Sequence, residues 1–179
     1  PRSPATRSFM KASDATRKFL RYGARDMGEL TRVAFLLPLR LFCGWTLLNT
    51  GLKKLSDGWL VRPELANTIN GWLRDGRPYG FYAPFLRDVV LPHAHVFSML
   101  VSFGELLVGA ALLAGLFSRL AAAAGVLLTL NFMLGRGDGI GANNTAPWVV
   151  MMLTLMLTSP GRALGLDAAL RGKVPRWLS

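Results

Sequence analysis

Residues 94–134 read AHVFSMLVSFGELLVGAALLAGLFSRLAAAAGVLLTLNFML, and this stretch decides the fold class because its only formal charges are Glu105 and Arg119. Extending it to residues 89–161 adds only Arg136 and Asp138 as charged residues. A soluble protein with so little charge over such a length would expose large apolar patches to water and aggregate. A lipid bilayer tolerates such a surface, so we expect an integral membrane protein.

The rest of the chain supports this expectation. Its 179 residues are 51% hydrophobic and 17% charged, whereas an ordinary soluble domain carries roughly 25% charged residues. The apolar segments predict an all-α, four-helix membrane bundle with spans near residues 31–52, 94–117, 120–134 and 145–158. The last two are short for a hydrocarbon core that needs ~20 helical residues. Residues 55–90 mix aromatic side chains with both signs of charge, which is typical of short interfacial helices in an outer loop.

Small residues recur at spacings of four or seven, as in Ala121 with Gly125 and Gly44 with Gly51. Spacing of four is the pattern of closely packed membrane helices. It is common in alanine-rich sequence, so it supports a tight bundle and no more.

The net charge of +11 is concentrated at the two ends of the chain. Eight basic residues against three acidic ones precede Val33, and four against one follow Pro160. The positive-inside rule therefore predicts that both ends are cytoplasmic and that they contact anionic lipid. We expect a cytoplasmic amphipathic segment at 1–30, a membrane domain at 31–172 and a cytoplasmic tail at 173–179. Helical spacing of apolar residues predicts that the first segment lies on the membrane surface, the alternative being a partner-binding tail. No nucleic-acid-binding motif accompanies the charge.

Arg40 and Glu105 each lie well inside an apolar span. A charge in hydrocarbon costs about 2.5–3.5 kcal/mol on insertion scales unless it is paired or reaches water. Opposite charges on neighbouring helices would stabilise each other, so the two predict an intramembrane pair. The pair has two interpretations: a proton or ligand site, or a structural contact that sets helix register.

The outer loop offers a second candidate site. His93 and His95 begin the second span, beside Tyr79, Tyr82 and Trp72 in the sequence. They could donate hydrogen bonds to a quinone carbonyl at the membrane surface, or simply cap the helix. Haem ligation across a bundle usually draws histidines from two helices, and the chain has a single cysteine, so we expect no haem or metal site.

Four stretches together resemble the DoxX/DoxD family of small four-helix bacterial membrane proteins, and the resemblance covers residues 33–172. The stretches are Arg40–Gly44 with Asn49–Leu55, Gly80–Leu86 with Val89–Pro92, Gly104–Gly109 through Leu113–Leu116 to Ser118–Ala121, and Asn131–Leu134 with Gly161–Ala168.

The resemblance implies the bacterial plasma membrane and a likeness to the small membrane subunit of thiosulfate:quinone oxidoreductase. It marks Arg40, Lys53, Glu105 and Arg119 as recurrent charged positions. We therefore expect an accessory subunit of a quinone-linked respiratory or photosynthetic complex that is not catalytic alone and binds lipids and partner subunits. The alternatives are a DoxD-like thiosulfate:quinone oxidoreductase subunit and a small transporter. The candidate quinone or lipid contacts are Lys53, Trp72, Tyr79, Tyr82, His93, His95 and Arg119.

Overall fold

The computed structural model describes residues 35–137, 145–158, 161 and 165–169. Every regular element in this part of the chain is helical, as predicted. The predicted amphipathic N-terminal segment and the C-terminal tail lie outside the described residues.

The helices keep the order that the hydropathy pattern predicts. Three short elements separate the first long helix from the second, which confirms the prediction of short helices in that loop. The elements are α2 (Leu37–Ser56), α3 (Glu64–Arg74), α4 (Ala83–Phe85), the π-helix η1 (Leu86–Val90), α5 (Ala94–Ala114), α6 (Ser118–Arg136), α7 (Ala146–Thr158) and α8 (Leu166–Ala169).

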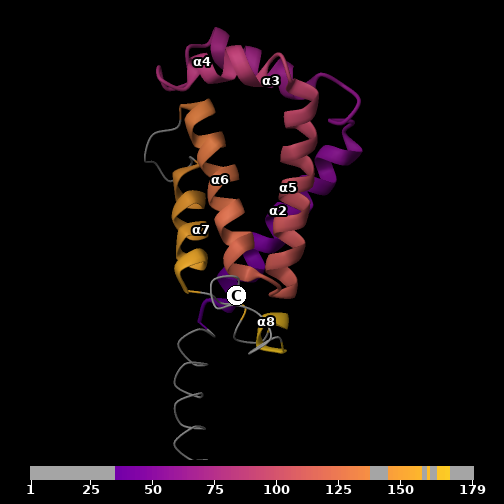
Figure 1. Cartoon of the computed structure of the whole chain (residues 1–179), viewed down its shortest axis with the longest axis vertical. Helices are drawn as coiled ribbons and strands as arrows, with labels where there is room; N and C mark the ends of the chain where they lie inside the picture. The colour runs from indigo at the N-terminus through magenta and orange to yellow at the C-terminus, as the bar shows by residue number, and fades with distance from the viewer. Residues whose placement is uncertain (1–34, 138–144, 159–160, 162–164, 170–179) are drawn as a thin grey trace, which may run out of the picture.

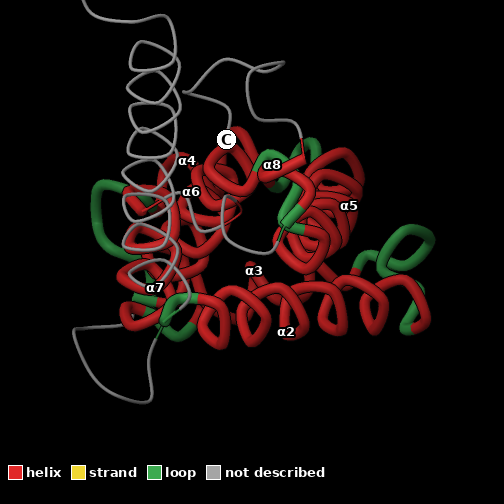
Figure 2. The backbone as a smooth tube through the Cα atoms, turned by 90° about the horizontal axis from the view of Figure 1, so that it is seen from below, coloured by secondary structure: helices red, strands yellow, loops and turns green. Residues whose placement is uncertain are grey.

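The long helices form two pairs, α2 with α5 and α6 with α7, and the turn between α5 and α6 joins the pairs (Figure 1). The short helices α3 and α4 lie across one end of the bundle, which we call the cap end. The helix α8 lies at the opposite end, which we call the α8 end (Figure 1). Figure 2 shows the bundle from below, with no described segment coloured as strand.

Two of these helices, α5 and α6, are long and apolar enough to cross a membrane by length and composition. The helix α2 has 20 residues but carries Arg40, Lys53 and Lys54. The helix α7 has 13 residues, fewer than a full crossing needs. That α2 and α7 also cross stays a prediction. Large apolar side chains nevertheless face outward on all four, including Trp45, Leu107 and Leu127.

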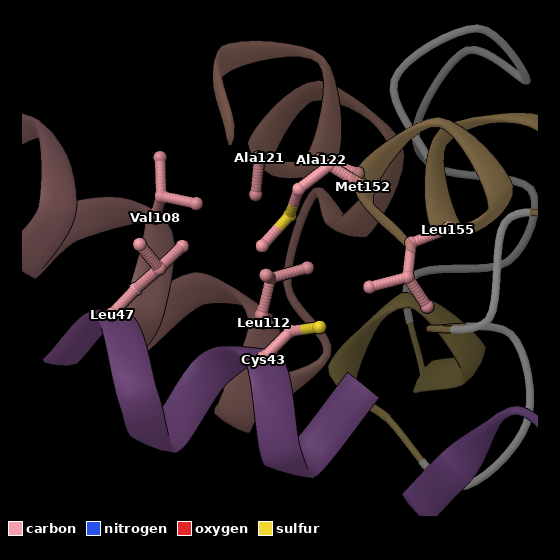
Figure 3. Close-up of a cluster of buried hydrophobic side chains, with 8 residues drawn as sticks. All are labelled: Cys43, Leu47, Val108, Leu112, Ala121, Ala122, Met152 and Leu155. Carbon is pink, nitrogen blue, oxygen red and sulfur yellow. The ribbon is translucent and has the colours of Figure 1, made fainter. Parts of the chain in front are cut away.

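The core of the bundle is a cluster of small and medium side chains from all four long helices (Figure 3). Thin side chains such as Ala122 let the helices approach one another, and Met152 from α7 fills the remaining space against Gly125. The cluster consists of Cys43, Leu47, Val108, Leu112, Ala121, Ala122, Met152 and Leu155.

Helices α2 and α5 are in backbone contact because glycines face each other. A Cβ placed on Gly109 would collide with the backbone nitrogen of Leu48 and lie 2.8 Å from the carbonyl oxygen of Gly44. A Cβ on Gly51 would lie 2.9 Å from the backbone nitrogen of Leu106. Only glycine permits an approach this close, so these positions hold α2 against the face of α5 that carries Glu105.

Candidate functional site

A cavity of about 330 Å³ lies between the two helix pairs. We call it the central cavity. All four long helices contribute to its wall. The lining combines hydroxyls, charged groups and aromatic rings. The lining residues are Thr46, Leu47, Thr50, Glu105, Thr129, Phe132, Arg136, Thr145 and Trp148.

One of the lining residues, Glu105, belongs to an ion pair with Lys54. The Lys54 Nζ lies 2.5 Å from Glu105 Oε1, and the two side chains are 16% and 5% exposed. The same ammonium lies 5.1 Å from the ring centroid of Trp59 and 4.8 Å from that of Phe132. Cation–π contacts of this kind strengthen when the cation is desolvated. Lys54 is therefore held by a carboxylate and two aromatic rings.

The second oxygen of the Glu105 carboxylate, Oε2, is not part of this ion pair. Glu105 Oε2 is buried, and no group in the described part of the chain forms a hydrogen bond with it. The Thr50 hydroxyl is close to the carboxylate, but its proton points to a backbone carbonyl. Three threonines of the lining donate to backbone oxygens of their own helix: Thr46 to Phe42 at 2.9 Å, Thr50 to Leu47 at 3.0 Å and Thr129 to Gly125 at 2.8 Å.

The predicted pairing of Arg40 with Glu105 is wrong. On α2, the residue that packs beside Glu105 is Gly51, and eleven residues of helix put Arg40 about 16 Å further along the axis. The Arg40 guanidinium instead lies at the α8 end, where its Nη1 would be 2.8 Å from a Cβ on Gly115. The carboxylate that attracts it is Asp167. The two charges are both buried, as predicted, but each has its own counter-charge.

Asp167 also holds the turn between α5 and α6. Its Oδ1 accepts a hydrogen bond from the Phe117 amide at 2.7 Å, and its Oδ2 accepts from the Ser118 amide at 2.9 Å and hydroxyl at 2.7 Å. Its own amide donates to the Gly115 oxygen at 2.8 Å. Phe117 has φ of +46°, a left-handed conformation that is uncommon for a residue with a side chain. Asp167 thus satisfies the first amides of α6 and stabilises this turn.

A second cavity, of about 320 Å³, lies under the cap, and we call it the cap cavity. It is apolar except at its edge, where the Tyr82 hydroxyl donates to Asn131 Oδ1. Burial raises the pKa of Tyr82. Phe132 lines both cavities. The lining residues are Leu65, Ile69, Trp72, Tyr82, Phe85, Leu86, Val90, Phe97, Leu100, Val101, Leu127, Leu128, Asn131 and Phe132.

The structure places the other predicted contacts in different parts of the molecule. Trp72 and Tyr82 share the cap cavity. His93 and His95 are exposed at the start of α5, where His95 lines a separate surface pocket of about 180 Å³. Tyr79 is 38% exposed and packs on another aromatic ring. The remaining two lie at opposite ends of the bundle, Lys53 exposed near the cap and Arg119 in the first turn of α6.

Sequence reasoning identified Glu105 but missed the polar residues of α2 around it. Thr46, Thr50 and Lys54 follow each other at intervals of four, which puts them on one face of a helix. That spacing was the available signal for a polar stripe on α2. Asp167 had no such signal, because its position beside Arg40 depends on how the chain returns after α7.

The described residues contain no group of three or more His, Cys, Asp or Glu side chains that could hold a metal ion. The absence of a metal site in the whole chain stays a prediction.

Comparison with known families agrees with this architecture. The family model DoxX matches residues 35–135, more than half of the chain. The chain belongs to the DoxX family. The match runs from the start of α2 to the end of α6, so it contains Lys54, Glu105 and most of the lining of both cavities. With the apolar helices α5 and α6, it identifies a membrane protein. No solved structure matches this DoxX protein.

Proposed function

We propose that this DoxX protein is an accessory membrane subunit of a larger quinone-linked redox complex, and that it holds a quinone ring in the central cavity. The observation that carries the proposal is the buried Glu105, which pairs with the part-buried Lys54 and lines a cavity to which all four long helices contribute. Ionisable residues inside a membrane bundle are costly and usually mark a ligand or ion site. A cavity of about 330 Å³ lies at the lower end of the range for small-molecule sites.

The chemistry of the lining favours a ring with polar groups at its edge. Phe132 and Trp148 supply flat apolar surface, and aromatic rings pack favourably on such faces. Arg136, Glu105 and the threonine hydroxyls supply polar atoms at the ring's edge. An isolated hydrocarbon chain could form no hydrogen bond with Glu105 or the threonine hydroxyls, so it would gain nothing from this polar edge.

The cap cavity fits the first part of an isoprenoid tail. It is almost entirely apolar, and Phe132 forms a shared wall with the central cavity. Rotation of one side chain would then connect ring and tail sites. If the tail lies there, the affinity of the protein for a quinone should rise with the first few carbons of its tail, by up to ~0.8 kcal/mol for each CH₂ that is buried.

In this proposal α2 and α7 also cross the bilayer, both chain ends are cytoplasmic and the cap lies on the outer side of a bacterial plasma membrane. Partner subunits supply the redox centre, because moving electrons to or from a quinone requires a cofactor. The chain itself stabilises the assembly and positions the quinone.

Calorimetric titration of the detergent-purified protein with decyl-ubiquinone, a short-tailed benzoquinone, tests the site. Thr46→Trp places a large ring into the central cavity from a half-buried position and should weaken binding at least about tenfold, the equivalent of 1.4 kcal/mol. Val150→Trp adds the same ring on the exposed face of α7, where Val150 is 63% exposed, and should leave binding unchanged. No binding to the wild type, or equal binding by both variants, would contradict the proposal.

The assembly is tested separately. The chain is purified from membranes in mild detergent, and the proteins that accompany it are identified by mass spectrometry. Stoichiometric redox subunits would support the accessory role, and a chain that always purifies alone would contradict it.

A further inference from the structure

On the wall of the central cavity, Glu105 and the threonine hydroxyls present hydrogen-bond acceptors, whereas Arg136 carries N–H donors. A ring hydroxyl can donate to the first kind of group and accept from the second. From this we infer that the site binds the dihydroxy form of the ring, the quinol, in preference to the quinone. This inference rests on the proposed quinone site and names the redox form that the site favours.

The first observation is the state of the Glu105 carboxylate. The Lys54 ammonium donates to Oε1 at 2.5 Å, so the carboxylate is the acceptor in this contact. An ionised carboxylate is only an acceptor. Its Oε2 is buried without a hydrogen-bond donor from the described residues, and Glu105 lines the cavity. A buried acceptor of this kind requires a donor, and an unsatisfied charged group costs more than the usual 1–3 kcal/mol of a neutral one.

The second observation is the direction of the threonine hydroxyls. Thr46, Thr50 and Thr129 each donate to a carbonyl of their own helix. Their oxygens retain lone pairs, so these side chains also present acceptors to a ligand. Three threonines and one carboxylate therefore favour the same kind of partner.

A quinol carries two O–H donors, whereas a quinone presents two carbonyl acceptors. The quinol hydroxyl satisfies Glu105 Oε2, and a quinone carbonyl at the same place would face an oxygen of like partial charge. Sites built to hydrogen-bond a ligand hydroxyl discriminate strongly against analogues that lack it. The site thus stabilises the reduced ring by binding alone, with no electron transfer by this chain.

The wild-type protein tests this directly. Decyl-ubiquinone and its chemically reduced quinol are titrated separately, the quinol under argon. The quinol should bind about tenfold more tightly, which corresponds to one charge-assisted hydrogen bond. In a redox titration of the bound ligand, this preference raises the two-electron midpoint potential by about 30 mV relative to the free couple in the same micelles.

Glu105→Gln tests whether the carboxylate itself causes the preference for the quinol. The amide retains an oxygen for Lys54 and turns an N–H₂ donor towards the ligand, so the quinol preference should disappear or reverse. Glu64→Gln makes the same chemical change in the first turn of α3, away from both larger cavities, and should preserve the preference.

The outcomes separate the two proposals. Equal affinity of the wild type for both forms, or tighter binding of the quinone, overturns this inference and leaves the quinone site intact. Failure of both forms to bind removes the proposed site itself. If Glu105→Gln does not fold, the midpoint potential of the wild-type complex still decides between these outcomes.

Discussion

Two buried carboxylates differ in how completely their oxygens are satisfied. Asp167, at the α8 end, accepts from two amides and one hydroxyl and lies near the guanidinium of Arg40. Glu105, in the middle of α5, binds Lys54 through one oxygen and has no donor for the other among the described residues. Asp167 packs against a turn, whereas Glu105 faces a cavity.

This difference separates a structural charge from a ligand-binding one. A fully hydrogen-bonded buried carboxylate stabilises one conformation and has no remaining capacity for a ligand. An incompletely satisfied carboxylate beside open space is unfavourable in the free protein, and a ligand relieves that cost when it binds. Burial and charge alone do not distinguish the two, because both side chains are almost wholly inaccessible.

The largest effect is expected from Asp167→Asn. The amide puts an N–H₂ group among N–H donors and leaves Arg40 without its counter-charge, and breaking a buried pair in this way costs about 3–5 kcal/mol. Glu105→Gln should cost about 1 kcal/mol, because the amide oxygen still accepts from Lys54. The free energy of unfolding in mixed micelles measures both. Exposed Asp57→Asn is the control and should change little. If the two substitutions lowered the free energy of unfolding equally, the distinction between the two carboxylates would be contradicted.

A smaller effect is expected from Gly109→Ala. The new Cβ collides with the α2 backbone at Leu48, so the helices must separate, and overpacking of this kind typically costs 1–3 kcal/mol. Because α2 carries Lys54, the separation should also weaken the ion pair with Glu105 and reduce ligand affinity.

Gly104→Ala is the control on the same helix. Its Cβ meets only the side chain of Leu128, at 3.4 Å, so thermal stability and ligand affinity should remain close to wild type. A Gly109→Ala protein with unchanged stability and affinity would show that the site does not depend on the close contact between α2 and α5.

The smallest effect is expected from Tyr82→Phe, which removes the hydrogen bond between the cap and Asn131. The loss should be about 1 kcal/mol at neutral pH. Because burial raises the pKa of Tyr82 in the folded protein, ionisation above about pH 10 favours the unfolded chain. The stability advantage of the wild type over Tyr82→Phe should therefore shrink as pH rises above 10. A stability difference that does not change with pH would contradict the raised pKa of Tyr82.

The sequence predicted the helices well because a run of apolar residues is a local feature of the chain. The long segment between residues 94 and 134 divides into α5 and α6 as expected, but the break lies at residues 115–117, just before the expected turn at Ser118 and Arg119. Glu105 was identified from its isolation among apolar residues. The first helix begins and ends later than expected, at Leu37 and Ser56, because its final turn includes Lys53 and Lys54. Charges at a helix end can extend towards the interface without interrupting the helix.

The partners of the charges could not be predicted in the same way. Arg40 was paired with Glu105 because each lies well inside an apolar span and the two carry opposite charges. The register between α2 and α5 is instead determined by Gly44, Gly51 and Gly109, and it places the two about 16 Å apart along the axis. Tertiary register and the return of the chain after α7 are non-local, so neither Lys54 nor Asp167 could be assigned its role from spacing alone.

One experimental density map of the protein in lipid nanodiscs, prepared with decyl-ubiquinol, tests the central claim most directly. We expect a ring in the central cavity with an oxygen within hydrogen-bond distance of Glu105 Oε2, and Asp167 contacting only protein groups. A central cavity closed by side chains, or a ring bound elsewhere while Glu105 Oε2 is satisfied by the protein, would contradict the account.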